Sequence, residues 1–160
     1  MTIKLDDLNG PEIQELLRYH LTHLSAISEP CSMHALNLDA LRKPNITFWS
    51  VWSETNPPDL MGCGALKELD STHAEIKSMR TVAAHLRKGV AANLLTHIIA
   101  EARRRNYHRL SLETGAGPLF TAAQTLYQKF GFQPSAPFAD YKPDPNSLFF
   151  TREINLYEPT

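Results

Sequence analysis

The residues that suggest chemistry most directly form a short basic turn. Arg87, Lys88 and Gly89 separate a strand-like segment from a segment with helical periodicity. The first turn of a helix exposes N–H groups without intrahelical partners and carries the positive end of the helix dipole. Two cations, and a glycine that lets a ligand approach the backbone closely, favour an anion at this point. The turn is therefore predicted to bind phosphate, and specifically the pyrophosphate of a nucleotide-bearing cofactor.

The segments that must position this turn run from Glu75 to Ala102. Residues 75–82 include methionine, threonine and valine, which favour a strand. After Gly89 the apolar residues recur at the steps expected for one face of a helix. These residues are Val90, Ala91, Leu94, Leu95, Ile98, Ile99 and Ala102. Residues 109–113 are predicted as the next strand, so the path strand–helix–strand implies a parallel, right-handed crossover.

Other elements are expected on both sides of this crossover. Pro11 opens a first helix, residues 39–41 add a helical turn, and Gly131 ends a helix with an apolar stripe from Ala123 to Phe130. The remaining strands are predicted at 2–5, 46–52, 60–69 and 147–154, with residue 132 onward extended. Early antiparallel hairpins and one central parallel crossover predict an α/β fold, of mixed α+β type.

Composition limits the classes of function. The chain has 160 residues, which favours a single domain over residues 1–160. The net charge is −1, so there is no general basic excess for binding nucleic acid. No apolar run approaches the roughly 18 residues needed to span a bilayer. Cys31 and Cys63 form no CxxC pair, which favours two reduced thiols. We therefore expect a cytoplasmic protein that binds neither nucleic acid nor membranes.

Three segments together resemble motifs of the GNAT superfamily of N-acetyltransferases. Residues 78–95, SMRTVAAHLRKGVAANLL, are similar to its acetyl-CoA motif [QR]xxGx[GA], with Gly89 and Ala91 in the last two positions and Leu86 in the first. Residues 125–132, TLYQKFGF, resemble its LYxxxGF motif, and residues 61–69, MGCGALKEL, resemble the hairpin before the central strand. The resemblance covers most of the chain and extends to a bacterial subgroup whose acceptors are poorly assigned.

This resemblance implies a twisted mixed sheet of six or seven strands flanked by about four helices. It also implies that acetyl-CoA, the only cofactor expected, lies where the central strand and its parallel neighbour separate. Phe120 stands about where family members often have Asn, and it is expected as a wall for pantetheine or adenine. The residues expected to contact acetyl-CoA are Met79, Arg80, Thr81, Leu86, Arg87, Lys88, Gly89, Val90, Ala91 and Phe120.

The implied reaction is attack of a neutral amine on the acetyl thioester. A lysine-like amine has an ordinary pKa of about 10.4, so fewer than about one in a thousand is neutral at pH 7. Glu75 and Glu113 are candidates for the base, with a slight preference for Glu75 and with Glu113 orienting the acceptor. Charged strand ends without a catalytic role are the alternative for both. Tyr127 matches the family position that protonates the thiolate; an aromatic residue of the helix core is the alternative.

The first helix and the following loop are expected on the acceptor side. Four potential zinc ligands are His20, His23, Cys31 and His34, in the spacing HxxHx7CxxH. This spacing is not a standard one for zinc, so no metal is expected. The residues predicted to line the acceptor pocket are His23, Ser32, His34 and Thr114.

The sequence thus predicts transfer of an acetyl group from acetyl-CoA to a primary amine of a small molecule, within a ternary complex. Two alternatives stay open. One is a non-catalytic module that senses acyl-CoA or bridges a partner, and the other is acetylation of a protein lysine or N-terminus. A homodimer is also an expectation, because members of the family are often dimers.

Overall fold

The computed structural model describes the backbone of residues 1–27 and 38–154, and the side chains of residues 1–20 and 38–154. Within these residues the strands are β1 (Thr2–Leu5), β2 (Ile46–Trp52), β3 (Leu60–Glu68), β4 (His73–Thr81), β5 (Arg109–Gly115), β6 (Gln133–Ser135) and β7 (Ser147–Glu153). The helices are α1 (Pro11–Ile27), α2 (Leu38–Leu41), α3 (Val90–Arg104) and α4 (Thr121–Lys129), with the 3-10 helices η2 (Ala83–His85) and η3 (Pro118–Phe120).

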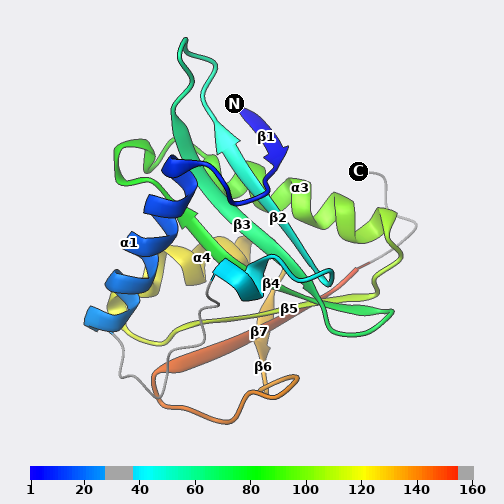
Figure 1. Ribbon diagram of the computed structural model, residues 1–160. Helices are drawn as coiled ribbons and strands as arrows, with labels where there is room; N and C mark the ends of the chain where they lie inside the picture. Colours follow the sequence, from blue (N-terminus) through cyan, green and yellow to red (C-terminus); the bar gives the residue numbers. More distant parts are fainter. Residues whose placement is uncertain (28–37, 155–160) are drawn as a thin grey trace.

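One seven-stranded mixed sheet carries the structure, in the order β1-β2-β3-β4-β5-β7-β6 (Figure 1). Strands β1 to β4 pair antiparallel with their neighbours along the chain. Strand β5 is parallel to β4, and helix α3 makes the connection between them. Strands β5, β7 and β6 continue the sheet in antiparallel pairs. The predicted fold class, strand number and central parallel crossover are confirmed.

Helices cover both faces of the sheet (Figure 1). The larger core packs α3 and α4 residues such as Leu95, Ile98 and Tyr127 against one face. The smaller core packs Ile13 and Leu17 of α1 and residues of α2 against the other. This division follows from the alternation of side chains along each strand, which sends every second residue to the opposite face. Each face is therefore apolar, and each needs its own helical layer.

Two glycines of β3 let α3 lie close to the sheet. A Cβ atom on Gly64 would lie 2.5 Å from Met79 Sδ and 2.9 Å from a methyl carbon of Leu94. A Cβ atom on Gly62 would lie 2.9 Å from a methyl carbon of Val90. Real Cβ atoms do not approach other atoms so closely, so these positions need glycine. Gly62 and Gly64 lack the third glycine and the following helix of a dinucleotide-binding motif. Their role is therefore to allow close packing of α3 on the sheet.

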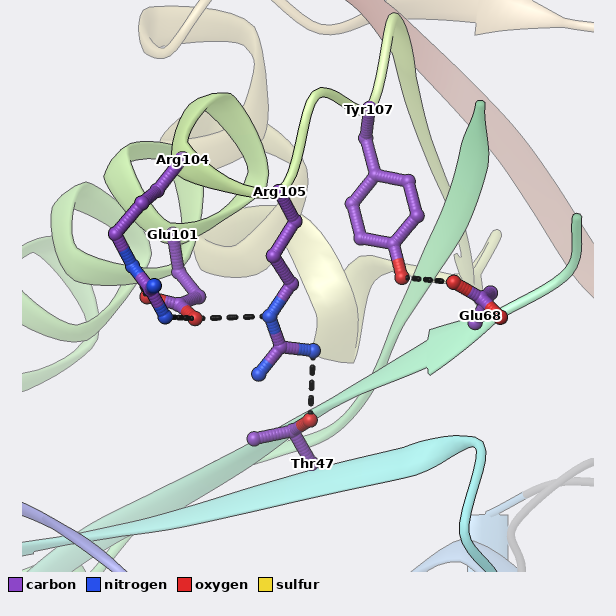
Figure 2. Close-up of polar contacts among 6 residues, drawn as sticks. All are labelled: Thr47, Glu68, Glu101, Arg104, Arg105 and Tyr107. Atoms are coloured by element: carbon purple, nitrogen blue, oxygen red, sulfur yellow. Dashed lines mark hydrogen bonds and ion pairs between the residues drawn. The ribbon is translucent and has the colours of Figure 1, made fainter. Parts of the chain in front are cut away.

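The C-terminal end of α3 is fastened to β2, and the residues after it to β3, by polar contacts (Figure 2). Arg105 donates to Glu101 Oε1 at 2.8 Å and to Thr47 Oγ1 of β2 at 2.8 Å. The Tyr107 hydroxyl donates to Glu68 Oε1 at the end of β3, at 2.6 Å. The helix has 15 residues, so its N-terminus lies roughly 22 Å away along the helix axis. These contacts help to fix the direction in which that N-terminus points.

The parallel strands β4 and β5 part halfway along their length. Their pairing runs from His73↔Arg109 to Ile76↔Leu112 and stops there. Beyond that point β4 continues along β3, and β5 continues along β7. A register shift in the β3–β4 pair adds one residue to β4, where Ser78 has φ 57°. The separation that the family resemblance implied is thus present.

Candidate active site

A groove of about 1010 Å³ opens where β4 and β5 part. Its walls come from β4, β5, the N-terminal turn of α3, η3, α4 and α1. The predicted residues that line it are Glu75, Met79, Arg80, Thr81, Leu86, Arg87, Gly89, Val90, Ala91, Glu113, Thr114, Phe120 and Tyr127. Residues far apart in the sequence therefore meet along one groove.

The basic turn forms one end of this groove. Arg87 has φ 63° and Gly89 has φ 81°, both in the left-handed region, and Gly89 is the N-cap of α3. No side chain caps this helix, so its first N–H groups are open to a ligand. Lys88 does not line the groove; its Nζ lies 3.3 Å from His85 Nδ1. The geometry suits an anion held by backbone amides, with the positive helix end behind them.

Tyr127 of α4 lines the groove. The side chain is 7% exposed, and its ring packs edge-on against Phe132 at a centroid distance of 5.8 Å. Burial, together with the negative charge of Glu113, raises the pKa of Tyr127 well above its ordinary value. The hydroxyl is therefore neutral at physiological pH and is available as a hydrogen-bond donor.

Glu75 lies in a buried polar cluster on the α1 side of the sheet. Its Oε2 accepts hydrogen bonds from Lys77 Nζ at 3.0 Å and from the Tyr141 hydroxyl at 2.5 Å. Lys77 Nζ also donates to the Tyr141 hydroxyl at 2.8 Å. The side chains of Lys77 and Glu75 are only 7% and 3% exposed. A buried carboxylate is tolerable here because its charge is paired and hydrogen-bonded.

Glu113 and Thr114 follow the last β4–β5 pair, on the opposite wall of the split. Burial raises the pKa of both Tyr127 and Tyr141, the charge of Glu75 adds to the rise for Tyr141, and the charge of Glu113 contributes to both. Phe120 lies against β5, because a Cβ atom on Gly115 would come within 2.1 Å of its ring. This wall of the groove therefore combines a carboxylate with an aromatic face.

Comparisons with known proteins decide the family. The family model described as acetyltransferase (GNAT) family matches residues 13–132. The chain belongs to the GNAT acetyltransferase family. The uncharacterized N-acetyltransferase YsnE of Bacillus subtilis (strain 168) is 56% identical over 96% of this chain and 100% of its own length. The uncharacterized N-acetyltransferase YedL of Escherichia coli (strain K12) is 51% identical over 94% of this chain and 92% of its own length.

Solved GNAT structures share the fold. A putative acyl-CoA N-acyltransferase from Klebsiella pneumoniae superposes with a TM-score of 0.75 at 27% identity, over 96% of this chain and 97% of its own. A GNAT family acetyltransferase from Elizabethkingia anophelis with acetyl-CoA bound gives 0.66 at 21% identity, over 95% of this chain and 97% of its own. The protein is an acetyl-CoA-dependent N-acetyltransferase. None of the helices in residues 1–27 and 38–154 is long and apolar enough to cross a membrane.

The expected acceptor residues fall largely beyond what the structure describes. His23 belongs to α1, but its side chain lies outside the described part, and Ser32 and His34 lie outside the described residues altogether. Thr114 does line the groove. Of the HxxHx7CxxH set only the side chain of His20 is described, and it too lines the groove. Among the described residues no three His, Cys, Asp or Glu side chains gather as a metal site.

Several polar groove residues had no role in the sequence-based prediction, among them Lys77, Tyr19, Tyr141 and Asn146. Lys77 could have been predicted, since it lies two residues after Glu75 on one strand and must therefore point to the same face of the sheet. The indication is weaker for Tyr19, which is the neighbour of His20 on the first helix. Tyr141 and Asn146 reach the groove from the irregular segment before β7, where no periodicity indicates which side chains turn inward.

Proposed function

We propose that this enzyme acetylates a primary amine of a small molecule, by direct attack on acetyl-CoA within a ternary complex. The observation that carries the proposal is the groove itself. It connects an uncapped helix N-terminus with a strand separation, and it is lined by the buried Tyr127 hydroxyl and by Glu113. These are an anion site, a channel for an extended chain, a hydrogen-bond donor and a carboxylate, in one continuous space.

Acetyl-CoA is assigned to the α3 side of this groove. The backbone amides of residues 86–91 and the Arg87 side chain would hold the pyrophosphate. The pantetheine arm would follow Met79, Arg80 and Thr81, whose strand has lost its partner on the β5 side. Phe120 would close the wall beside it. Lys88, which is exposed and does not line the groove, would act as a more distant charge.

Glu113 is assigned as the base, which reverses the slight preference for Glu75 drawn from the sequence. Glu75 Oε2 already accepts hydrogen bonds from Lys77 and Tyr141, and a proton added there would weaken a buried ion pair. Glu113 lines the same groove as Tyr127, and its charge contributes to the raised pKa of that tyrosine. It would take one proton from the ammonium group, directly or through water, before the nitrogen attacks.

The attack forms the C–N bond and then breaks the C–S bond of the thioester. A backbone N–H near Met79 or Arg80 would stabilise the oxyanion. The thiolate needs a proton, and ordinary pKa values of about 10 and 8.5 make its transfer from tyrosine uphill by roughly 2 kcal/mol. The raised pKa of Tyr127 increases that cost. The main role of Tyr127 would therefore be to donate a hydrogen bond to the sulfur atom, and not to transfer its proton. Overall, ammonium and thioester give amide, free thiol and one proton.

Cys63, the cysteine within the described residues, is poorly suited to carry the acetyl group as a thioester intermediate. Its side chain is fully buried, and its Sγ donates to the Ser78 carbonyl at 3.3 Å. Burial raises the pKa of the Cys63 thiol to about 12. The thiolate, which is the nucleophilic form, is therefore scarce at neutral pH.

Variants of the two carboxylates test the assignment. Glu113→Gln should lower kcat/KM roughly 100-fold at pH 7, and raising the pH toward 10 should restore much of it, because more amine is then neutral without a base. Glu153→Gln removes an exposed carboxylate at the end of β7 and serves as the matched control. A Glu113→Gln enzyme with the wild-type rate and pH profile would remove Glu113 from the chemistry.

A further inference from the structure

The side chain of Arg80 lies on the acceptor side of the sheet. Arg80 pairs with Cys63 in the antiparallel β3–β4 ladder, so both side chains point to the same face. Cys63 packs in the smaller core, under α1. The guanidinium carbon of Arg80 lies 5.1 Å from the centre of the Tyr19 ring of α1, and both residues line the groove. The arginine therefore projects away from α3, whose N-terminus is the proposed pyrophosphate site.

Arg80 differs from Lys77, a second cation on the same face, in how its charge is paired. Lys77 points the same way, since its partner Ala65 also packs in the smaller core, and it forms a buried ion pair with Glu75. Among the described residues, Arg80 forms no ion pair with a carboxylate. Its described side-chain contact is the Tyr19 ring, which holds the guanidinium by a cation–π interaction. A guanidinium stacked on a ring still offers its N–H edge to a planar anion.

The geometry points to a carboxylate-bearing amine, of which free amino acids are the simplest, as the acceptor, with its carboxylate on Arg80. This inference rests on the proposed small-molecule function and names its substrate class. The groove offers such a zwitterion a cation on β4 and a carboxylate, Glu113, on β5. Lys77 and Glu75 cancel each other's charge, so they add no net preference.

The same arrangement disfavours other amines. A polycationic acceptor would bring a second positive charge toward Arg80 in a half-enclosed groove, where screening by water is reduced. An uncharged alkyl amine would leave the guanidinium without the anion that its position suits. Specificity would thus come from both attraction and repulsion at one residue.

The test compares three acceptors with the same side chain: leucine, leucinamide and isopentylamine. Release of CoA thiol gives kcat/KM for each with the wild type, Arg80→Lys and Arg80→Gln. The three amines differ in basicity, so the informative quantity is the change on mutation within each acceptor. Other amino acids with their amides and amines extend the series if leucine is a poor substrate. Arg104→Gln removes an equal charge from the exposed far end of α3 and is the matched control.

We expect Arg80→Gln to lower kcat/KM for the amino acid at least about tenfold and to leave the amide and the amine within about threefold. Arg80→Lys should retain part of the preference, and Arg104→Gln all of it. Calorimetry gives a readout without turnover: N-acetylleucine should bind the wild-type enzyme with CoA and should lose that binding in Arg80→Gln.

Two results would overturn the inference in distinguishable ways. If wild type prefers the amines without a carboxylate, or Arg80→Gln slows all three acceptors equally, small amines remain substrates but Arg80 does not select them. If no small amine is acetylated while a peptide lysine or N-terminus is, the proposed small-molecule function itself fails, and this inference fails with it.

Discussion

Removing the Tyr141 hydroxyl tests whether the cluster around Glu75 is as tightly coupled as its distances indicate. In Tyr141→Phe, Glu75 loses a hydrogen bond of 2.5 Å, and Lys77 loses its second oxygen partner at 2.8 Å. A hydrogen bond to a charged group contributes about 1.5–3 kcal/mol, and the Glu75 side chain is too buried for water to replace the donor easily. We therefore expect a loss of about 1.5–3 kcal/mol, or roughly 3–12 °C in Tm for a chain of this size.

Tyr107→Phe supplies the matched control. Its hydroxyl also donates to a glutamate, Glu68, at 2.6 Å (Figure 2). Glu68, however, is exposed, so water can solvate the carboxylate when the tyrosine oxygen is removed. The same change of one atom should then cost about 1 kcal/mol or less.

Chemical denaturation of the two variants and the wild type measures the difference. The prediction is that Tyr141→Phe lowers the free energy of unfolding by clearly more than Tyr107→Phe does, with similar m-values. Equal losses, or a larger loss for Tyr107→Phe, would refute the reasoning that burial of the glutamate partner sets the magnitude.

Three further predictions follow from the same structure. Gly64→Ala should destabilise by about 1–3 kcal/mol, because its methyl group would overlap Met79, and thermal unfolding measures this. Replacing both Arg87 and Lys88 by alanine should raise the Kd for acetyl-CoA roughly 3- to 30-fold at low salt, less at high salt, as titration calorimetry can show. Burial, with the charge of Arg109, lowers the pKa of His73. Its protonation thus opposes folding, so stability should fall as pH drops through and below 6.5, and His73→Gln should flatten that slope.

Each of these has a result that contradicts it. Gly117→Ala is the control for Gly64→Ala, since a Cβ atom there meets nothing within 4 Å; equal stability of the two variants would refute the packing argument. An unchanged Kd in the Arg87 and Lys88 double variant would move the phosphates to another part of the groove. A His73→Gln protein with the wild-type dependence of stability on pH would show that other groups produce the slope.

Most of the fold could be predicted from local patterns. Strand β2 lies at the predicted residues 46–52, because this run of aromatic and β-branched residues is bounded by a turn at each end. Strand β4 instead begins at His73, two residues before the predicted segment 75–82. The Asp70 side chain accepts from the Thr72 N–H at 2.8 Å and stabilises the turn that precedes the strand. The short helices η2 and η3 were not predicted, because three residues carry no periodicity.

From residue types alone the site was predictable only where its residues are consecutive, whereas the separate positions Glu113, Phe120 and Tyr127 were expected once the family resemblance was in hand. The basic turn could be predicted directly from residues 86–91, because these residues are neighbours in the sequence. All of them except Lys88 line the groove. The cluster of Glu75, Lys77 and Tyr141 is different, because Tyr141 lies 64 residues from Lys77 in sequence and only tertiary packing joins them. Likewise, the contact of Arg80 with Tyr19 depends on where α1 packs. The single domain and the homodimer stay predictions.

The central claim is acetyl transfer to a small primary amine, and a direct product measurement tests it best. The enzyme would be mixed with acetyl-CoA and a panel of amino acids, alkyl amines and peptides, with thiol release and N-acetyl products followed together. The account predicts equimolar thiol and N-acetylated product with at least one small amine, and a lower turnover number in Tyr127→Phe with little change in acetyl-CoA affinity. Binding of acetyl-CoA without turnover of any small amine, or acetylation of the peptides alone, would contradict it.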